Sequence, residues 1–339
     1  MNPFEYRAPQ SLNEVTAILS NDAHARIVSG NTDFINEMKE EIVNPKVVLS
    51  LSKISELTQI NWSRKALVIG AMVTLKTLAS ENKLHAECPV ISQAVDSIAT
   101  PQIRNLATIG GNLCQRPRCW YYRSQRFDCL KKGGDVCFAV DGINRYHAIF
   151  GGTNCHIVHP SDLATVLTSL NASIDIHGPR GSRNVPINNF FMGPEVDVES
   201  ENCLGPDELI KSVQIPREYI SFTSTFVKAK ERSALDFALV SVAVAIKKEG
   251  NFISGAGITL GGVAPVPWKL PSLEQDLVGS AIDEVSCDLM VKRTFLNATP
   301  MKHNGYKVPM TQAYLKRALH DVLMRLSLSH SSGCKTQIY

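Results

Sequence analysis

Residues 26–39 read RIVSGNTDFINEMK, and this stretch decides the fold of the first part of the chain. A β-prone run at 26–28 leads through a Ser-Gly-Asn turn into a helix-like segment at 33–41. A second strand-like run, KVVL, follows at 46–49. These segments predict a small βαβ unit whose glycine-containing turn lies between a strand and a helix.

Other segments extend this pattern along the chain. SLNE at 11–14 has the form of a helix capping box, and Ser-Asp at 161–162 should cap an apolar helix at 163–170. We further expect strands at 65–70, 155–158 and in the runs after 223, and helices at 90–98, 283–296 and 311–328. The β-prone runs after residue 223 predict a domain boundary near 215–217.

The composition is that of a soluble globular protein. The chain has 339 residues, 44% of them hydrophobic and 20% charged, so two or three domains are expected. The longest apolar stretch, 237–246, has about half of the roughly twenty residues that a membrane-spanning helix needs. The N-terminal residues lack the apolar run of a secretory signal. We therefore predict no membrane span and a cytoplasmic location, or a periplasmic one if a partner subunit's signal exports the complex.

Two glycine-containing turns could approach a phosphate group. They are VSGNTD at 28–33 and ATIGGN at 107–112. Glycine lets the backbone come close to an anion, which exposed N–H groups then hold. Neither turn has the GxGxxG spacing or the lysine of a P-loop. Taken alone, each is compatible with phosphate binding or with an ordinary turn.

The cysteines are clustered. Six of the nine lie between residues 88 and 155, and this range includes a stretch (115–154) that is rich in Gly, Arg and aromatic residues and has no periodicity. The spacing of Cys119, Cys129, Cys137 and Cys155 matches neither a structural zinc site nor a ferredoxin run. Buried free thiols, a zinc-binding adaptor and a redox cluster therefore all remain open.

The same stretch carries a local positive charge. Between residues 115 and 132 there are six Lys or Arg residues, one Asp and four aromatic residues, which together could indicate binding to single-stranded nucleic acid. The whole chain has a net charge of only +3, so no wider basic face accompanies the stretch. We therefore predict no nucleic-acid partner. We expect the guanidinium groups to neutralise thiolates, phosphates or a partner's acidic surface instead.

Four motifs in order along the chain resemble one family. They are VSGNTDFINEMK at 28–39, TPQIRNLATIGGNLCQ at 100–115, HPSDLATVLTSLNA at 159–172 and FVKAKERSALDFALVSVAVAI at 226–246. In this order they are similar to the FAD-binding subunit of xanthine oxidase family molybdenum hydroxylases. The resemblance implies an α+β fold, with two α/β FAD-binding subdomains of the vanillyl-alcohol-oxidase type and a C-terminal α+β domain like that of carbon monoxide dehydrogenase flavoproteins. The implied limits are 1–57, 58–217 with an insertion at about 115–155, 218–330, and a tail at 331–339.

The resemblance also implies where FAD would bind. The turn at 28–34 would wrap the FAD diphosphate, Thr108, Gly111 and Asn112 would form the opposite wall, and Ile98 would pack near the adenine end. Asp162 would contact FAD, and the Lys228 cation would lie beside the flavin ring, where it favours the reduced, anionic form. The full predicted set is Ile27, Val28, Ser29, Gly30, Asn31, Thr32, Asp33, Phe34, Ile98, Thr108, Gly111, Asn112, Cys114, Ser161, Asp162, Ile210, Lys228 and Phe237.

The resemblance gives the cysteine stretch a meaning as well. Most members of the family connect the GGN motif to the Ser-Asp motif by a short segment, whereas this chain inserts roughly forty residues. A subgroup that includes periplasmic aldehyde oxidoreductases holds a four-iron four-sulfur cluster in such an insertion, and so do 4-hydroxybenzoyl-CoA reductase flavoproteins. On this resemblance the cluster ligands would be Cys119, Cys129, Cys137 and Cys155.

The implied function is that of an electron-transfer subunit. A molybdopterin-binding large subunit would oxidise the substrate, and a small two-iron two-sulfur subunit would pass the electrons to FAD on this chain, in a heterotrimer that could pair into a dimer of trimers. We assign no catalytic residue, because the sequence offers no acid–base pair for a substrate pocket. The alternatives are a zinc-binding adaptor and a stand-alone FAD oxidase of the same fold.

Overall fold

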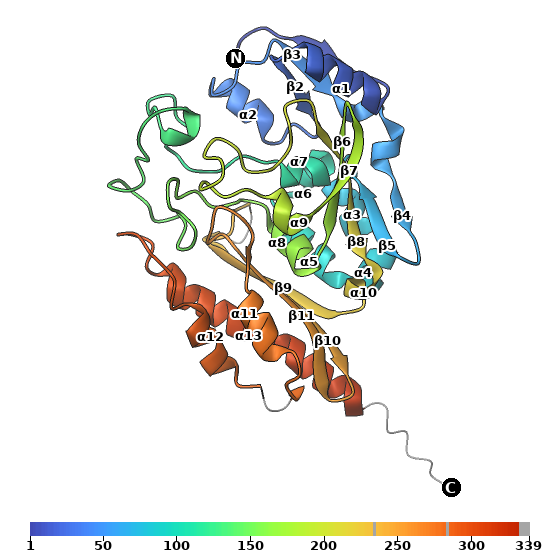
Figure 1. Ribbon diagram of the computed structural model, residues 1–339, viewed down its shortest axis with the longest axis vertical. Helices are drawn as coiled ribbons and strands as arrows, with labels where there is room; N and C mark the ends of the chain where they lie inside the picture. The colour runs from blue at the N-terminus through green and yellow to red at the C-terminus, as the bar shows by residue number, and fades with distance from the viewer. Residues whose placement is uncertain (233–234, 283–284, 332–339) are drawn as a thin grey trace.

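Three β-sheets, each with helices packed on it, make up the molecule (Figure 1). The structure is a computed structural model that describes residues 1–232, 235–282 and 285–331. One sheet is parallel and two are antiparallel, which confirms the predicted α+β class. Of the predicted elements, residues 283–284 and the tail from 332 onward lie outside the described residues.

The first sheet is the predicted βαβ unit with one strand added. Its order is β1 (Glu5–Arg7), β3 (Val47–Ser50), β2 (Ala25–Val28), and all three strands are parallel. Helix α1 (Leu12–Asn21) and helix α2 (Phe34–Lys39) join the strands. The capping box at the start of α1 is confirmed, because the backbone N–H of Glu14 donates to Ser11 Oγ at 3.2 Å and the Glu14 carboxylate accepts from the N–H of Gln10 at 2.8 Å.

The second sheet has five antiparallel strands. Their order is β4 (Ile60–Trp62), β5 (Ala66–Gly70), β8 (Leu209–Pro216), β6 (Ser173–Gly178) and β7 (Gly181–Pro186). The helices of this region are α3 (Leu75–Ser80), α4 (Asn82–Glu87), α5 (Pro89–Ser97), α6 (Pro101–Leu106), α7 (Ile109–Leu113), α8 (Asp162–Ser169) and α9 (Ile187–Phe190). Two short 3-10 turns, Leu51–Lys53 and Ser55–Thr58, lead into it from the first sheet. Both sheets contribute to one hydrophobic core.

The third sheet connects two cores. Its order is β12 (Trp268–Lys269), β11 (Phe252–Gly261), β10 (Val240–Glu249), β9 (Thr223–Ala229), all antiparallel. Along β10, Val242 and Val244 belong to a core shared with the C-terminal helices, whereas Ala243 and Ala245 belong to the core of the first two sheets. Alternate side chains of a strand face opposite ways, so β10 is buried on both faces.

Three helices of the described residues accompany the third sheet: α11 (Pro271–Leu277), α12 (Cys287–Thr294) and α13 (Lys307–Ser331). The short helix α10 (Arg217–Ile220) packs against β8 of the second sheet. The longest, α13, runs along the sheet on the side away from the rest of the molecule (Figure 1). Among the described residues, no helix has both the length and the apolar character that crossing a membrane would require.

The segment between α7 and α8 is almost entirely irregular. Its one helical turn is Leu130–Lys132, and in Figure 1 the green loops of this segment extend beside α2. The predicted strand at 155–158 is wrong. The backbone there bonds to other loops instead of a strand edge: the N–H of Ala148 donates to His156 O at 2.9 Å, and that of His159 to Ala264 O at 2.9 Å.

Candidate FAD site and cysteine cavity

The two glycine turns face each other across one cavity, here called the glycine cleft. Residues 25–34, with Thr108, Gly110 and Gly111, line it. A Cβ atom at Gly30 would lie 2.6 Å from the carbonyl carbon of Leu106, and one at Gly111 would lie 2.6 Å from Ser29 Oγ. Gly30 therefore requires glycine, because the backbone of Leu106 approaches too closely for a side chain, whereas at Gly111 the Ser29 hydroxyl would have to move. A hydrogen bond of 3.1 Å from Thr108 Oγ1 to Ser29 Oγ joins the two walls.

Most of the predicted FAD contacts line this cleft. They are Ile27, Val28, Ser29, Gly30, Asn31, Thr32, Asp33, Phe34, Thr108, Gly111, Cys114 and Ile210. Burial raises the pKa of the Cys114 thiol to about 12, so this thiol stays protonated at neutral pH. Sequence reasoning missed the wall formed by Leu204, Gly205, Pro206, Glu208 and Leu209, because this segment lies outside the four motifs of the resemblance.

A second cavity, the Lys228 cavity, holds the rest of the predicted set except Ser161. It is lined by Ile98, Asn112, Asp162, Lys228 and Phe237, and it shares Thr32 and Gln115 with the glycine cleft. Ile98, which the resemblance would place near the adenine end of FAD, lines this cavity together with Lys228. It follows the last residue of α5, and the guanidinium of Arg104 donates to its carbonyl oxygen at 2.8 Å.

Lys228 and Asp162 form a buried ion pair. Their side chains are 4% and 6% exposed, and Lys228 Nζ lies 2.7 Å from Asp162 Oδ2. Burial raises the pKa of Asp162, and the Lys228 ammonium opposes that shift. The resemblance implied Asp162 and Lys228 as two separate contacts of FAD, and the structure shows that they form an ion pair with each other.

Ser161 places Asp162 at the start of α8. Its Oγ accepts from the N–H of Ala164 at 2.9 Å, as the predicted cap requires, and it also donates to Asn112 Oδ1 at 2.6 Å. This second hydrogen bond connects the GGN motif with the Ser-Asp motif. It joins residues that are 49 positions apart, and no local pattern predicts it.

The four insertion cysteines line a single small cavity, the cysteine cavity. Cys119, Cys129, Cys137 and Cys155 all line it, and it is much smaller than the glycine cleft. Cys137 and Cys155 are hydrogen-bonded to each other, which lowers the pKa of Cys137 to about 5 and raises that of Cys155. No three or more His, Cys, Asp or Glu side chains within the described ranges are grouped so as to hold a metal ion.

His147 stands at the wall of the cysteine cavity. Its Nε2 atom lies 3.3 Å from Cys119 Sγ, and burial lowers its pKa to about 4, so the ring is neutral at pH 7. A fourth cavity, the joining cavity, shares Cys119 and His147 with the cysteine cavity and shares Asp162 and Phe237 with the Lys228 cavity. The joining cavity therefore connects the cysteines to the Lys228 end of the cleft.

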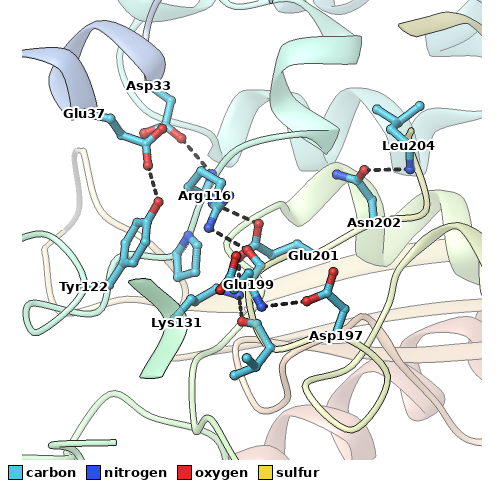
Figure 2. A network of polar contacts seen from close by, with 12 residues as sticks. Asp33, Glu37, Arg116, Tyr122, Lys131, Asp197, Glu199, Glu201, Asn202 and Leu204 are labelled. Carbon is cyan, nitrogen blue, oxygen red and sulfur yellow. Dashed lines mark hydrogen bonds and ion pairs between the residues drawn. The ribbon is translucent and has the colours of Figure 1, made fainter. Parts of the chain in front are cut away.

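Four of the six basic residues between 115 and 132, Arg116, Arg118, Arg123 and Lys131, pair with carboxylates of this chain, and Figure 2 shows Arg116 and Lys131 beside Glu201. Glu201 lies 2.9 Å from Arg116 Nε and 2.6 Å from Lys131 Nζ, and Tyr122 donates to Glu37 at 2.6 Å. The carboxylate of Asp33, on the turn of the first motif, forms ion pairs with two further arginines. The sequence showed the local positive charge but not its partners, which lie far away along the chain.

Comparisons with known proteins identify the family. Residues 2–218 match the family model described as the FAD binding domain in molybdopterin dehydrogenase, and residues 224–322 match the CO dehydrogenase flavoprotein C-terminal domain. The chain belongs to this family. It is an FAD-binding medium subunit of the xanthine oxidase family of molybdenum hydroxylases, and hence part of an oxidoreductase.

Individual relatives agree with this assignment. The chain is 31% identical to the aldehyde oxidoreductase FAD-binding subunit PaoB of Escherichia coli (strain K12), over 95% of this chain and 98% of the relative. It is 25% identical to the xanthine dehydrogenase FAD-binding subunit of Escherichia coli O157:H7, over 94% and 95%. Among solved structures, a chain of the carbon monoxide dehydrogenase from Hydrogenophaga pseudoflava superposes with a TM-score of 0.76 at 25% identity, covering 96% of this flavoprotein chain and 99% of that chain.

Proposed function

We propose that this flavoprotein carries electrons within a three-subunit molybdenum hydroxylase. A molybdopterin-binding large subunit would oxidise an aldehyde or an N-heterocycle such as xanthine, and a two-iron two-sulfur small subunit would deliver the electrons to FAD held here. The main support is the row of connected cavities, which leads from Gly30 through Lys228 to Cys119. Such a row would bring an electron carrier bound in the cleft within reach of a second carrier at the cysteines.

The residues of the glycine cleft and the Lys228 cavity fit FAD. Two walls without side chains at Gly30 and Gly111 suit the diphosphate, and the neighbouring Lys228 cavity suits the flavin ring. When bound, FAD supplies reversible uptake of electrons. Lys228 pairs with Asp162 at 2.7 Å, so the two side chains together give the ring a polar wall of low net charge. Phe237 covers the same cavity, and the guanidinium of Arg118 lies 4.7 Å from its ring centroid.

The cysteine cavity is our proposed location for a four-iron four-sulfur cluster. Four thiols from one irregular insertion converge on it, and the buried ammonium of Lys131 lines it too, which would offset thiolate charge. In such a cluster each cysteine binds a different iron atom. The Sγ atoms of the four cysteines are therefore farther apart than the ligand atoms around a single metal ion. His147 would orient Cys119 through the contact at its Sγ atom.

The FAD assignment is tested by the absorption spectrum of the purified full chain. We expect a flavin spectrum after reconstitution with FAD, and its loss in the variant Gly111→Val, whose side chain would fill the narrowest part of the cleft. A wild-type chain that takes up no FAD would contradict the assignment.

The cluster is tested by a pair of cysteine variants. Cys129→Ser should abolish the electron paramagnetic resonance signal of the reduced cluster while FAD is retained, because Cys129 lines the cysteine cavity and not the cleft. The control, Cys287→Ser, changes a partly exposed thiol on α12 and should leave the signal intact. Equal signals from both variants would exclude the proposed ligand set.

A further inference from the structure

Asp33 lies on the wall of the glycine cleft, yet its carboxylate is bound by the insertion. Arg118 Nη1 forms an ion pair with its Oδ1, Arg123 Nη2 donates to the same oxygen at 2.9 Å, and the backbone N–H of Arg116 donates to Oδ2 at 2.8 Å. The Asp33 side chain is only 13% exposed, so water screens its charge weakly. Two guanidinium groups and one backbone N–H from residues 116–123 thus offset the charge of the Asp33 carboxylate, which lies on the turn before α2.

This neutralisation matters because the cleft has little other positive charge to offer. Two cations line it, Arg26 and Arg116. Arg116 is already paired with Glu201 at 2.9 Å, and Arg26 donates to the carbonyl oxygens of Ala23 and Ala25. A bare carboxylate at Asp33 would therefore repel a diphosphate in the same cleft, and of the two lining cations only Arg26 is not already paired with a carboxylate.

The two arginines also connect the cleft to the rest of the proposed site. Arg118 lines the Lys228 cavity and the joining cavity, and its Nη2 donates to Gln115 Oε1 at 3.0 Å. Arg123 donates to the carbonyl oxygens of Pro117 and Arg116 at 2.8 and 3.1 Å, which folds the insertion around the carboxylate. Cys119 lies next to Arg118 in sequence and within this folded segment.

We propose that Arg118 and Arg123 are positioning residues for FAD, which act by cancelling the charge of Asp33 at the diphosphate wall. The insertion is then a part of the FAD site, and FAD affinity depends on its being folded. This inference rests on the proposed placement of FAD in the glycine cleft. It goes beyond that placement because it attributes part of the chain's affinity for FAD to residues outside the two glycine turns.

The test compares FAD affinity in three variants of the full chain after removal of flavin. Arg118→Met with Arg123→Met should weaken FAD binding by about tenfold or more, because it exposes the diphosphate to Asp33. Adding Asp33→Asn to that double variant should restore most of the affinity. A purely structural role of the arginines predicts no such rescue, so a triple variant that binds as weakly as the double variant would overturn the proposal.

The matched control is Arg126→Met. Arg126 lies in the same insertion and is exposed, and it has no ion pair among the described residues, so its removal should leave the affinity unchanged. If the double variant does not fold, the single variants Arg118→Met and Arg123→Met carry the test, each with and without Asp33→Asn. The loss should also shrink at high salt, where charge repulsion is screened.

The outcomes separate this inference from the proposed function. A wild-type chain that fails to bind FAD contradicts the proposed function itself. A wild-type chain that binds FAD while the double variant binds equally well contradicts only the role of the arginines.

Discussion

Different kinds of interaction stabilise the glycine cleft and the cysteine insertion. The cleft forms where the backbone at Gly30 meets that of Leu106 and where Gly111 faces the hydroxyl group of Ser29, between regular helices and strands. The insertion has almost no regular structure, and charged side chains hold it on Asp33 and Glu201. The first region should therefore respond to changes of side-chain volume and the second to changes of charge.

The largest effect on stability is expected when a substitution adds a methyl group to the wall of the glycine cleft. Gly30→Ala would place a Cβ atom against the Leu106 carbonyl group, and we expect a loss of about 4 kcal/mol in the free energy of unfolding together with loss of FAD. Gly305→Ala is the control, because a Cβ there meets no atom within 4 Å. Chemical denaturation of both variants makes the comparison, and a Gly30→Ala chain as stable as the control would show that the cleft is not limited by volume.

Lys228 provides a charge test inside the cleft region. Lys228→Met leaves Asp162 buried without a counter-ion and should lower the free energy of unfolding by about 3 kcal/mol. Lys228→Met with Asp162→Asn should recover much of the loss. The exposed pair of Lys211 and Glu56 is the control, where Lys211→Met should cost less than about 1 kcal/mol. Equal losses in the two single variants, measured by denaturation, would argue against a buried pair.

Glu201 tests the insertion in the same way. Glu201→Gln removes the counter-ion of Lys131, whose side chain is 2% exposed, and should destabilise the insertion by about 2 kcal/mol. Hydrogen exchange should speed up in residues 115–135 and change little in β10. Glu231→Gln, at the exposed pair with Arg145, is the control and should alter neither region. An equal increase of the exchange rate in residues 115–135 and in β10 would contradict the claim that Glu201 stabilises the insertion alone.

Much of this architecture could be predicted from short segments of sequence. The capping serines Ser11 and Ser161 act within four residues of themselves, and the turn at Gly30 lies between the strand and helix that the periodicity indicates. The contacts that hold the site together could not be predicted in this way. Asp33 meets Arg123 across 90 positions and Ser161 meets Asn112 across 49, so only the folded chain brings them together.

The smallest predicted effect is a change in pH dependence at Glu37. Burial raises the pKa of this carboxyl, and Tyr122 and Arg123 oppose the shift. The folded chain thus binds this proton more tightly than the unfolded chain. Its contribution to stability is complete below the ordinary value of 4.5 and is lost as the pH rises through the folded value.

Glu37→Gln removes that titration. Between about pH 4 and pH 7 the variant should lose roughly 1 kcal/mol less stability than the wild-type chain. Thermal denaturation at several pH values measures the difference, and Glu56→Gln, at an exposed site, should behave like wild type. Parallel stability profiles for wild type and Glu37→Gln would show that this carboxyl is not shifted.

The central claim is that one chain holds FAD in the glycine cleft and a cluster in the cysteine cavity beside it. The most direct measurement is the iron, sulfide, zinc and flavin content of the chain purified without oxygen. The account predicts about four iron and four sulfide for each FAD, and no zinc. One zinc and no iron for each chain, with flavin present, would contradict it.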